Sequence, residues 1–237
     1  MIQLVCCAVL LASTLRFAAA APQDAPLQMM TYQLVLLKKG PTPPPASPAE
    51  QKAMQDEHLA KLADLNRQGI SLVYGPILAD ADIRGIAVLT AENADAAKAR
   101  FAADPFVKAG VMTPEVYGWM GPKGWFSKPG SYDVSVPANL EPLIFGFLVR
   151  GPNTAQDKAT ADALQKGHLA YMDALHAQGK LVMAGPLVDA GERRGIVVYR
   201  VKDVTAAKAL AAEDPAVKAG RLTLEAYPWM TFKGILK

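Results

Sequence analysis

Two histidines are spaced along the chain in a way that could serve proton transfer. His58 and His168 each share one face of a predicted helix with apolar residues three or four positions apart. The two stripes are Met54, His58, Leu62 and Leu65, and Leu164, His168, Met172 and Leu175. A core-facing imidazole needs a partner, because a buried unpaired donor costs roughly 1–3 kcal/mol. Two interpretations stay open: a hydrogen-bonded core histidine, or a general acid/base that a nearby carboxylate holds in one tautomer.

A second set of polar side chains recurs near the ends of the two halves. Alternate residues of a strand point to opposite faces, and one face here carries a carboxylate, a phenol and an indole. These residues are Glu115, Tyr117 and Trp119, and again Glu225, Tyr227 and Trp229. They either wall a pocket for a small aromatic ligand or pack at an interface between the halves. Arg84 and Arg194, each at the start of another strand, could bind a carboxylate or phenolate, or form an ion pair that tethers a loop.

Both sets recur because the chain contains an internal repeat. Residues 58–124 align with residues 168–234 at a constant offset of 110 without a gap, and 30 of the 67 positions are identical. Such self-similarity indicates two copies of one small domain. In each copy an Asp-Pro pair, at Asp104 and Asp214, precedes a short turn ending in glycine, which is the pattern of a helix N-cap.

Each copy predicts the element order β-α-β-β-α-β. Residues 32–38 form an apolar strand, and Ser47, Pro48 and Glu50 are typical of a helix start. Gly69 ends that helix, strands follow at 70–77 and 84–89, a second helix runs from Asn93 to Asp104, and a strand covers 112–120. The order is that of a ferredoxin-like α+β unit. We expect two tandem βαββαβ repeats, at 30–124 and 143–237 with a linker over 125–142, whose sheets pack face to face as a fused pseudo-dimeric α+β barrel.

The first twenty residues are expected to be a signal peptide outside the fold. An apolar run over 4–15 is too short to span a membrane, and Ala18-Ala19-Ala20 resembles a cleavage site. Both cysteines, Cys6 and Cys7, lie there, so thiol chemistry is excluded for the exported chain. Removing Arg16 lowers the net charge from +3 to +2, which leaves no basic footprint for nucleic acid. We expect a periplasmic or secreted protein without membrane association.

Three features, in order, resemble the YCII-related family: His58-Leu-Ala, Gly75-Pro76 and the Ala-x-Asp-Pro-x-Val-x-Ala-Gly stretch around Asp104, all present again in the second copy. Members of this family are usually single domains that dimerise into an α+β barrel, so the resemblance implies that the dimer is fused here. It also implies an active-site pair of histidine and aspartate, with lyase-like and dehalogenating roles known in the group. Carried over by position, the pairs are His58 with Asp104 and His168 with Asp214.

The function stays open between classes. One hypothesis is an exported lyase or isomerase in which a His-Asp pair moves protons on an unidentified small molecule. The alternative is a non-catalytic ligand-binding or interaction module with structural histidines, and a haem-binding barrel is a remote third. No cofactor is expected: the chain has no His-x-His spacing for zinc and no glycine-rich phosphate loop. The assembly is expected to be a monomer with a pseudo-two-fold axis or a further homo-oligomer.

Overall fold

The computed structural model describes residues 28–127, 136–188 and 191–236. The predicted signal peptide and the middle of the predicted linker lie outside these ranges. In the part of the chain that the structure describes, no helix is both long and apolar enough to cross a bilayer. The fold has the α+β character predicted from the sequence, with two copies of the same unit.

The first repeat has the expected order, with the second helix divided in two. Its elements are β1 (Met29–Lys39), α1 (Pro48–Arg67), β2 (Ser71–Pro76), β3 (Ile83–Leu89), α2 (Ala94–Phe101), α3 (Pro105–Lys108) and β4 (Met112–Pro122). The second repeat follows a short 3-10 turn, η1 (Pro137–Asn139). Its elements are β5 (Leu140–Arg150), α4 (Lys158–Ala177), β6 (Leu181–Val188), β7 (Arg193–Tyr199), α5 (Val204–Glu213), α6 (Pro215–Lys218) and β8 (Leu222–Phe232).

Most element ends lie within one or two residues of the sequence prediction, but the starts of β1 and β5 and the end of α2 differ by three. The first strand of each repeat begins three residues earlier, so β5 starts inside the predicted linker. The cause is pairing: Met29 lies opposite Pro122 and Leu140 opposite Phe232, so each strand extends along the full length of its neighbour. The second helix stops at Phe101, and Asp104 starts a separate short helix instead of ending the first. An aspartate before proline favours a new start over a continuation.

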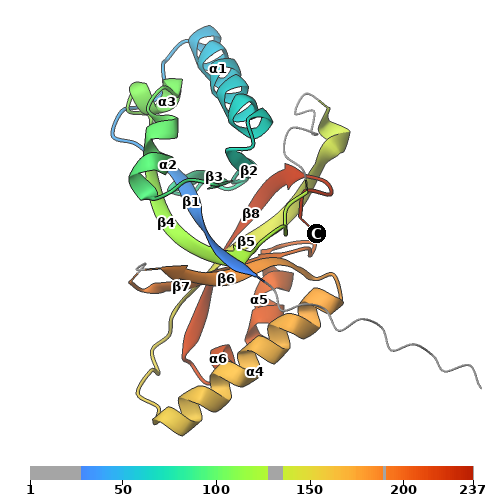
Figure 1. Cartoon of the computed structure of the whole chain (residues 1–237). Coiled ribbons are helices and arrows are strands. Elements are labelled where there is room, and N and C mark those ends of the chain that lie inside the picture. Colours follow the sequence, from blue (N-terminus) through green and yellow to red (C-terminus); the bar gives the residue numbers. More distant parts are fainter. Residues whose placement is uncertain (1–27, 128–135, 189–190, 237) are drawn as a thin grey trace, which may run out of the picture.

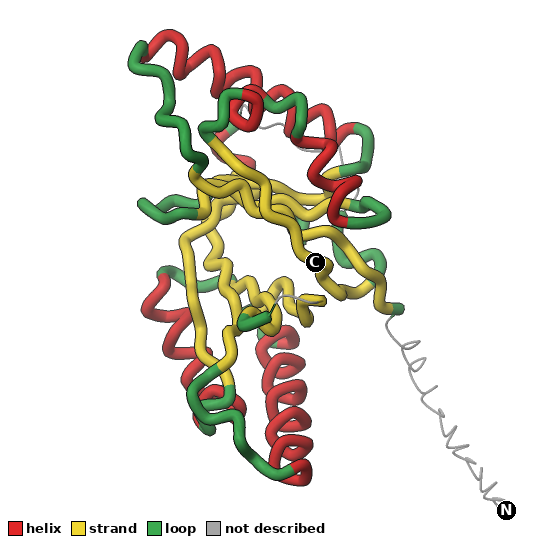
Figure 2. Tube along the Cα trace, turned by 90° about the vertical axis from the view of Figure 1, so that its left-hand side faces the viewer, coloured by secondary structure: helices red, strands yellow, loops and turns green. Residues whose placement is uncertain are grey.

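The eight strands form one sheet that closes on itself. Their order is β2-β3-β1-β4-β6-β7-β5-β8, and β4 joins β6 where Trp119 lies opposite Leu187. At the other edge Ile77 bridges to Trp229, and the Leu78 amide donates to the Pro228 carbonyl at 2.8 Å. Figures 1 and 2 show the strands in the middle of the molecule, with α1–α3 outside on one side and α4–α6 on the opposite side. The predicted fused α+β barrel is thereby confirmed, and hydrogen bonds join its two halves at both edges.

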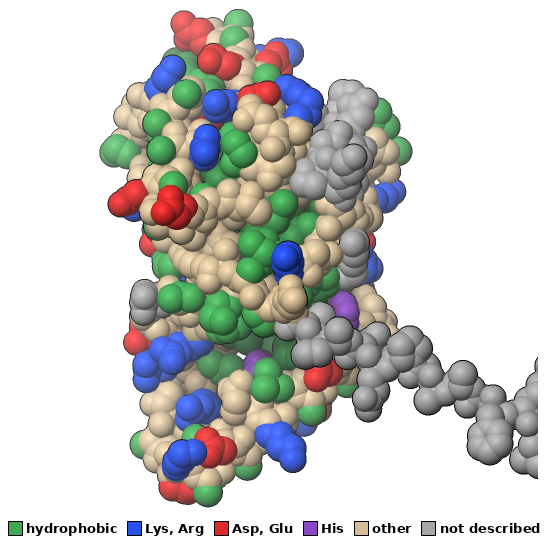
Figure 3. Space-filling view, viewed as in Figure 1, with side chains coloured by type: hydrophobic (Ala, Val, Ile, Leu, Met, Phe, Trp, Pro, Cys, Tyr) green, Lys and Arg blue, Asp and Glu red, His purple; other side chains and the backbone are tan. Residues whose placement is uncertain are grey.

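Large apolar side chains from both repeats fill the space between the two halves. Those with no exposed surface include Leu34, Leu36, Trp119, Phe145, Phe147 and Trp229. They belong to one hydrophobic core that spans the repeats, whereas a smaller core lies under the helices of the second repeat. On the outside, hydrophobic side chains gather in Figure 3 over the middle of the face, where the surface is hollowed above α4. The barrel therefore fixes the two repeats against each other and leaves their helices to build sites on the outer faces.

Candidate functional site

Helix α1 places His58 against the sheet. Ser47 caps the helix by accepting a hydrogen bond from the Glu50 amide at 3.4 Å, and Pro48 occupies the first turn. His58, Leu62 and Leu65 are buried on one face of this helix, as their spacing predicts. The His58 side chain is only 8% exposed, so its ring nitrogens depend on protein groups for partners.

Asp104 is the partner of His58. Its Oδ2 lies 2.5 Å from His58 Nδ1, and its side chain is fully buried. Its Oδ1 accepts hydrogen bonds from the amides of Phe106 at 3.0 Å and Val107 at 3.4 Å, which caps α3. The sequence suggested two separate roles for Asp104, and its carboxylate combines them: it caps α3 and forms a hydrogen bond with the His58 imidazole.

The second repeat contains the same arrangement. His168 Nδ1 lies 2.5 Å from Asp214 Oδ2, while Asp214 Oδ1 accepts from the Ala216 amide at 2.8 Å. Both predicted contacts form inside a single repeat rather than across the barrel. An ionised carboxylate can only accept, so each contact calls for a proton on Nδ1; in a neutral imidazole the lone pair then lies on Nε2.

His58 opens onto a cavity of about 430 Å³ between α1 and the sheet. The walls are mainly apolar and come from both repeats; they include Leu62 and Ile86 from the first and Leu140 and Met230 from the second. Among the described residues, His58 Nε2 has no hydrogen-bond partner. The volume falls in the range of about 300–1,000 Å³ that is usual for small-molecule sites.

Arg84 lies on the wall of the same cavity. Its guanidinium is 3.5 Å from Asp80, whose side chain is almost fully exposed, so this ion pair contributes little to stability. Arg84 is therefore available to a ligand carboxylate or enolate. Its repeat, Arg194, donates to the Gly191 carbonyl at 3.3 Å, a contact that tethers a loop.

Tyr74 forms another wall of this cavity, and burial raises the pKa of its phenol from 10.0 to about 12. The phenol ionises at a lower pH in the unfolded chain than in the folded one, so the free energy of unfolding falls as the pH rises from about 10 to 12. We expect a Tyr74→Phe variant to lose about 2 to 3 kcal/mol less stability than the wild type across that window. Urea unfolding at pH 9.5 and 12 measures the difference. Equal losses in the two proteins would mean that Tyr74 does not contribute.

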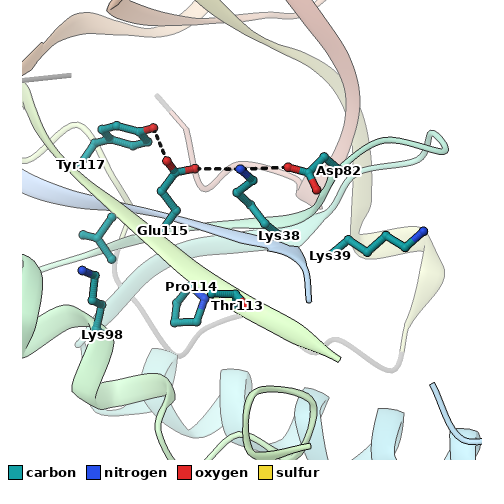
Figure 4. Close-up of a pocket in the computed structure, with 9 residues that line it drawn as sticks. Lys38, Lys39, Asp82, Lys98, Thr113, Pro114, Glu115 and Tyr117 are labelled. Carbon is teal, nitrogen blue, oxygen red and sulfur yellow. Dashed lines mark hydrogen bonds and ion pairs between the residues drawn. The ribbon is translucent and has the colours of Figure 1, made fainter. Parts of the chain in front are cut away.

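The polar face of β4 forms a second cluster at the barrel end. The Tyr117 hydroxyl donates to Glu115 at 2.7 Å, Glu115 lies 3.5 Å from the Lys38 ammonium, and Lys38 lies 2.9 Å from Asp82. Figure 4 shows this row of contacts beside an open cavity of about 520 Å³. Burial, followed by the hydrogen bond to Glu115, raises the pKa of Tyr117. Glu115 and Tyr117 thus line this cavity, and their role in binding a ligand stays a prediction.

The two tryptophans of the predicted polar face, Trp119 and Trp229, lie in the buried core instead. Trp119 is fully buried and stacks on Tyr32 with ring centroids 5.3 Å apart. Trp229 Nε1 donates to the Gly75 carbonyl of the other repeat at 3.1 Å. Neither indole lines either of the two cavities described here. Interface packing, the alternative interpretation of this face, accounts for both.

Sequence reasoning missed Arg193, which joins the two polar faces. Its Nη1 donates to the Tyr117 hydroxyl at 3.1 Å, and its guanidinium lies 4.1 Å from the Phe147 ring centroid. It also lies within 4 Å of Glu115 and of Glu225, the predicted repeat of Glu115. The two repeats differ at one strand pair: β1 carries Lys38 opposite Ile83 of β3, whereas β5 carries Val149 opposite Arg193 of β7. The positive residue thus lies on the first strand of one repeat and on the third strand of the other. As a result, Glu115 and Glu225 each have a positive neighbour.

We expect Arg193→Met to lower the free energy of unfolding by about 1 to 2 kcal/mol. The variant loses the bond to Tyr117 and the contact over Phe147, and it leaves two glutamates less compensated. Arg194→Met is the matched control, because Arg194 is exposed and its contact within the described residues is with the Gly191 carbonyl of a loop. Chemical denaturation of both variants measures the effect; equal stabilities would contradict it.

The described residues contain no cluster of three or more histidine, cysteine, aspartate or glutamate side chains that could hold a metal ion. Tyr227 is partly buried and packs against the barrel core, with its pKa raised by burial and by nearby Glu225. The His-Asp pair on the apolar cavity is therefore the arrangement in this part of the chain with the clearest chemistry.

Solved structures with a similar fold include a heme-binding protein from Thermus thermophilus. It is 13% identical, the match covers 87% of this chain and 93% of that chain, and the TM-score is 0.52. A variant of chlorite dismutase from Candidatus Nitrospira defluvii is 10% identical, with 87% and 92% covered and a TM-score of 0.54. At such identities the likeness shows the fold alone.

None of the curated proteins compared with this chain matches it. The sequence profile of the YCII-related domain matches twice, at residues 32–119 and 147–233. The two matches fall on the two structural repeats, and each includes one His-Asp contact. The chain therefore belongs to the YCII-related domain family and carries two copies of the domain in tandem.

Proposed function

We propose that this protein catalyses proton transfer on a small organic molecule, the chemistry of a lyase or isomerase, at His58. One observation carries the proposal: a buried carboxylate holds His58 Nδ1, and the same imidazole lines a mainly apolar, partly open cavity. A structural histidine would instead lie in a closed packed stripe, which is what the non-catalytic alternative predicts. The cavity beside His58 therefore favours the enzyme over the binding module.

The residues support a two-step proton transfer. Asp104 keeps the proton on Nδ1, so the lone pair on Nε2 can take a proton from a C–H or O–H group of a bound molecule. The resulting imidazolium is stabilised by Asp104 and can return the proton to another atom of the same molecule. Arg84 is suited to hold a carboxylate or a developing enolate oxygen. The mainly apolar walls lower the local dielectric, which strengthens these charged interactions.

Deuterium exchange tests the proposal without knowledge of the product. We would incubate the protein in D₂O with ketones and 2-oxo acids of one or two rings and follow loss of the C–H signal by NMR. The wild type should accelerate exchange of at least one compound by about 100-fold or more over His58→Gln.

The repeat offers the matched control, His168→Gln, which removes the same group from the other site. Exchange at the His58 site should persist in that variant. An exchange rate that survives His58→Gln unchanged would show that the activity lies elsewhere, and the proposal would be abandoned.

Haem binding is a second candidate, because a histidine held by a carboxylate through Nδ1 is also a usual metal ligand. His58 would hold the iron and Arg84 would pair with a propionate. Tyr74 and Phe232, which line the cavity, would have to move to admit a tetrapyrrole. Bound haem would supply redox or oxygen chemistry in place of proton transfer. Titration with hemin should then give a visible absorption shift that His58→Ala removes and His168→Ala keeps. No shift at stoichiometric hemin would leave acid/base chemistry as the function.

We also propose that the chain is exported by its N-terminal segment and acts in the periplasm or outside the cell. The apolar run and the alanines at 18–20 support this. Mass spectrometry of the protein from intact cells should show a chain that begins at Ala21. Recovery of the full-length chain would contradict export by this route.

A further inference from the structure

The cavity at His58 has one wall built by both repeats. Tyr74 comes from β2, and Thr231 and Phe232 come from the end of β8. Thr231 Oγ1 donates to the Tyr74 carbonyl at 3.0 Å, and the rings of Tyr74 and Phe232 meet edge to face with centroids 5.2 Å apart. All three residues are buried, so the wall is packed rather than loose. We call Tyr74, Thr231 and Phe232 the cross-repeat wall.

The second repeat lacks this wall. At the offset of 110, Ala184 replaces Tyr74, Gly121 replaces Thr231 and Pro122 replaces Phe232. The backbone is arranged in the same way, because a Cβ atom on Gly185 would meet Met120 just as one on Gly75 would meet Met230. A smaller residue thus stands at each of the three positions of the second repeat, on a backbone of equivalent geometry.

The repeats of two apolar residues that line the His58 cavity, Leu59 and Met230, are more exposed in the other half of the chain. Leu169 is 53% exposed, whereas its repeat Leu59 is 37% exposed. Met120 is 38% exposed, whereas its repeat Met230 is partly buried. The His168 side chain is itself slightly more exposed than that of His58, 12% against 8%. The two pairs have the same internal geometry but face surroundings of different shape.

We propose that the cross-repeat wall sets the size limit of the His58 site and that the His168 site binds larger apolar ligands. The inference rests on the proposed function, in that it assumes that His58 and His168 face bound molecules. The His58 site would take organic acids with one or two fused rings, with Arg84 on the carboxylate. The His168 site would take acids with a more extended apolar body, and Arg194, the repeat of Arg84, would bind their carboxylate. A fused chain can diverge in this way because each repeat supplies the wall of the other.

Three probes of increasing size test the proposal: benzoate, 1-naphthoate and 1-pyrenecarboxylate. Binding is followed through the imidazole ¹⁵N signals of the full chain, where His58 and His168 report on the two sites and His176 is an internal reference. In the wild type, benzoate and 1-naphthoate should shift the His58 signal, and 1-pyrenecarboxylate should shift only that of His168. In Tyr74→Ala, 1-pyrenecarboxylate should shift the His58 signal with at least about a 10-fold lower Kd.

The reverse exchange, Ala184→Tyr, keeps the test informative if Tyr74→Ala fails to fold. It builds the missing ring into the second site and should weaken 1-pyrenecarboxylate at His168 by at least about 10-fold, with the first site unchanged. Phe232→Leu is a milder opening of the first site and should have a smaller effect in the same direction as Tyr74→Ala.

The outcomes separate this inference from the proposed function. If 1-pyrenecarboxylate reaches His58 equally well in the wild type and in Tyr74→Ala, the wall does not select by size, while the His58 site itself stands. If none of the probes shifts the signal of His58 or His168 in any variant, both the wall and the proposed site are wrong. The wall is established if the probes bind in the expected order of size in the wild type, and if Tyr74→Ala opens the His58 site to 1-pyrenecarboxylate while Ala184→Tyr closes the His168 site to it.

Discussion

Replacing Asp104 with asparagine should slow deuterium exchange at the His58 site by about 10²- to 10⁴-fold while the protein stays folded. The asparagine carbonyl can still cap α3 through the Phe106 amide. Its NH₂ group, however, would donate to His58 Nδ1 and force the ring proton onto Nε2. The nitrogen that faces the cavity would then carry a proton and could not act as a base.

The measurement is the exchange rate of the best compound from the NMR panel, with thermal unfolding as a check on folding. Asp214→Asn is the matched control and should leave exchange at the first site intact. A rate within a few-fold of the wild type would show that the tautomer of His58 does not matter, and acid/base catalysis by this histidine would be rejected.

Replacing Asp104 with alanine should have the largest effect on stability, a loss of about 2 to 4 kcal/mol. The change removes the cap of α3, which is worth about 1 kcal/mol, and leaves the buried Nδ1 donor of His58 without a partner. Asp104 is fully buried and His58 nearly so, which limits the access of water to the groups that lose the carboxylate. Equilibrium urea unfolding gives the loss directly.

A double variant, Asp104→Ala with His58→Leu, apportions this loss. The second change removes the unpaired donor and should restore about 1 to 2 kcal/mol, whereas the capping loss remains. If the double variant is no more stable than Asp104→Ala, then the buried pair contributes nothing and the cap alone explains the effect.

The repeat made the architecture predictable from the sequence. Gly69, Gly75-Pro76 and Asp104-Pro105 mark element ends, and each recurs at the same offset, so errors in one copy could be checked against the other. The prediction placed the end of the second helix and the starts of β1 and β5 three residues too late. The strand starts depend on pairing with β4 and β8, far along the chain, which local spacing does not record.

The candidate site was predictable only in part. Helical spacing placed His58 toward the sheet, and the family resemblance supplied Asp104 as its partner. Arg193 and the cross-repeat wall were missed, because they depend on which residues of one repeat meet those of the other. Tyr74 and Phe232 lie far apart in the sequence, and nothing near either residue signals that their rings touch. Comparison of the copies at Ala184 and Pro122 could have marked these positions as divergent, but not as neighbours.

The closed order of strands has a consequence for biosynthesis. Strands β2 and β4 are the edges of the first repeat, and both find their partners, β8 and β6, only in the second repeat. While the ribosome is still making residues beyond 136, the finished first half therefore exposes two unpaired edges, which are templates for aggregation. Carrying both halves on one chain raises the local concentration of the correct partner far above that of a neighbouring nascent chain. Truncation after the first repeat should accordingly give a chain that associates with itself, which identifies the covalent link as a safeguard during synthesis.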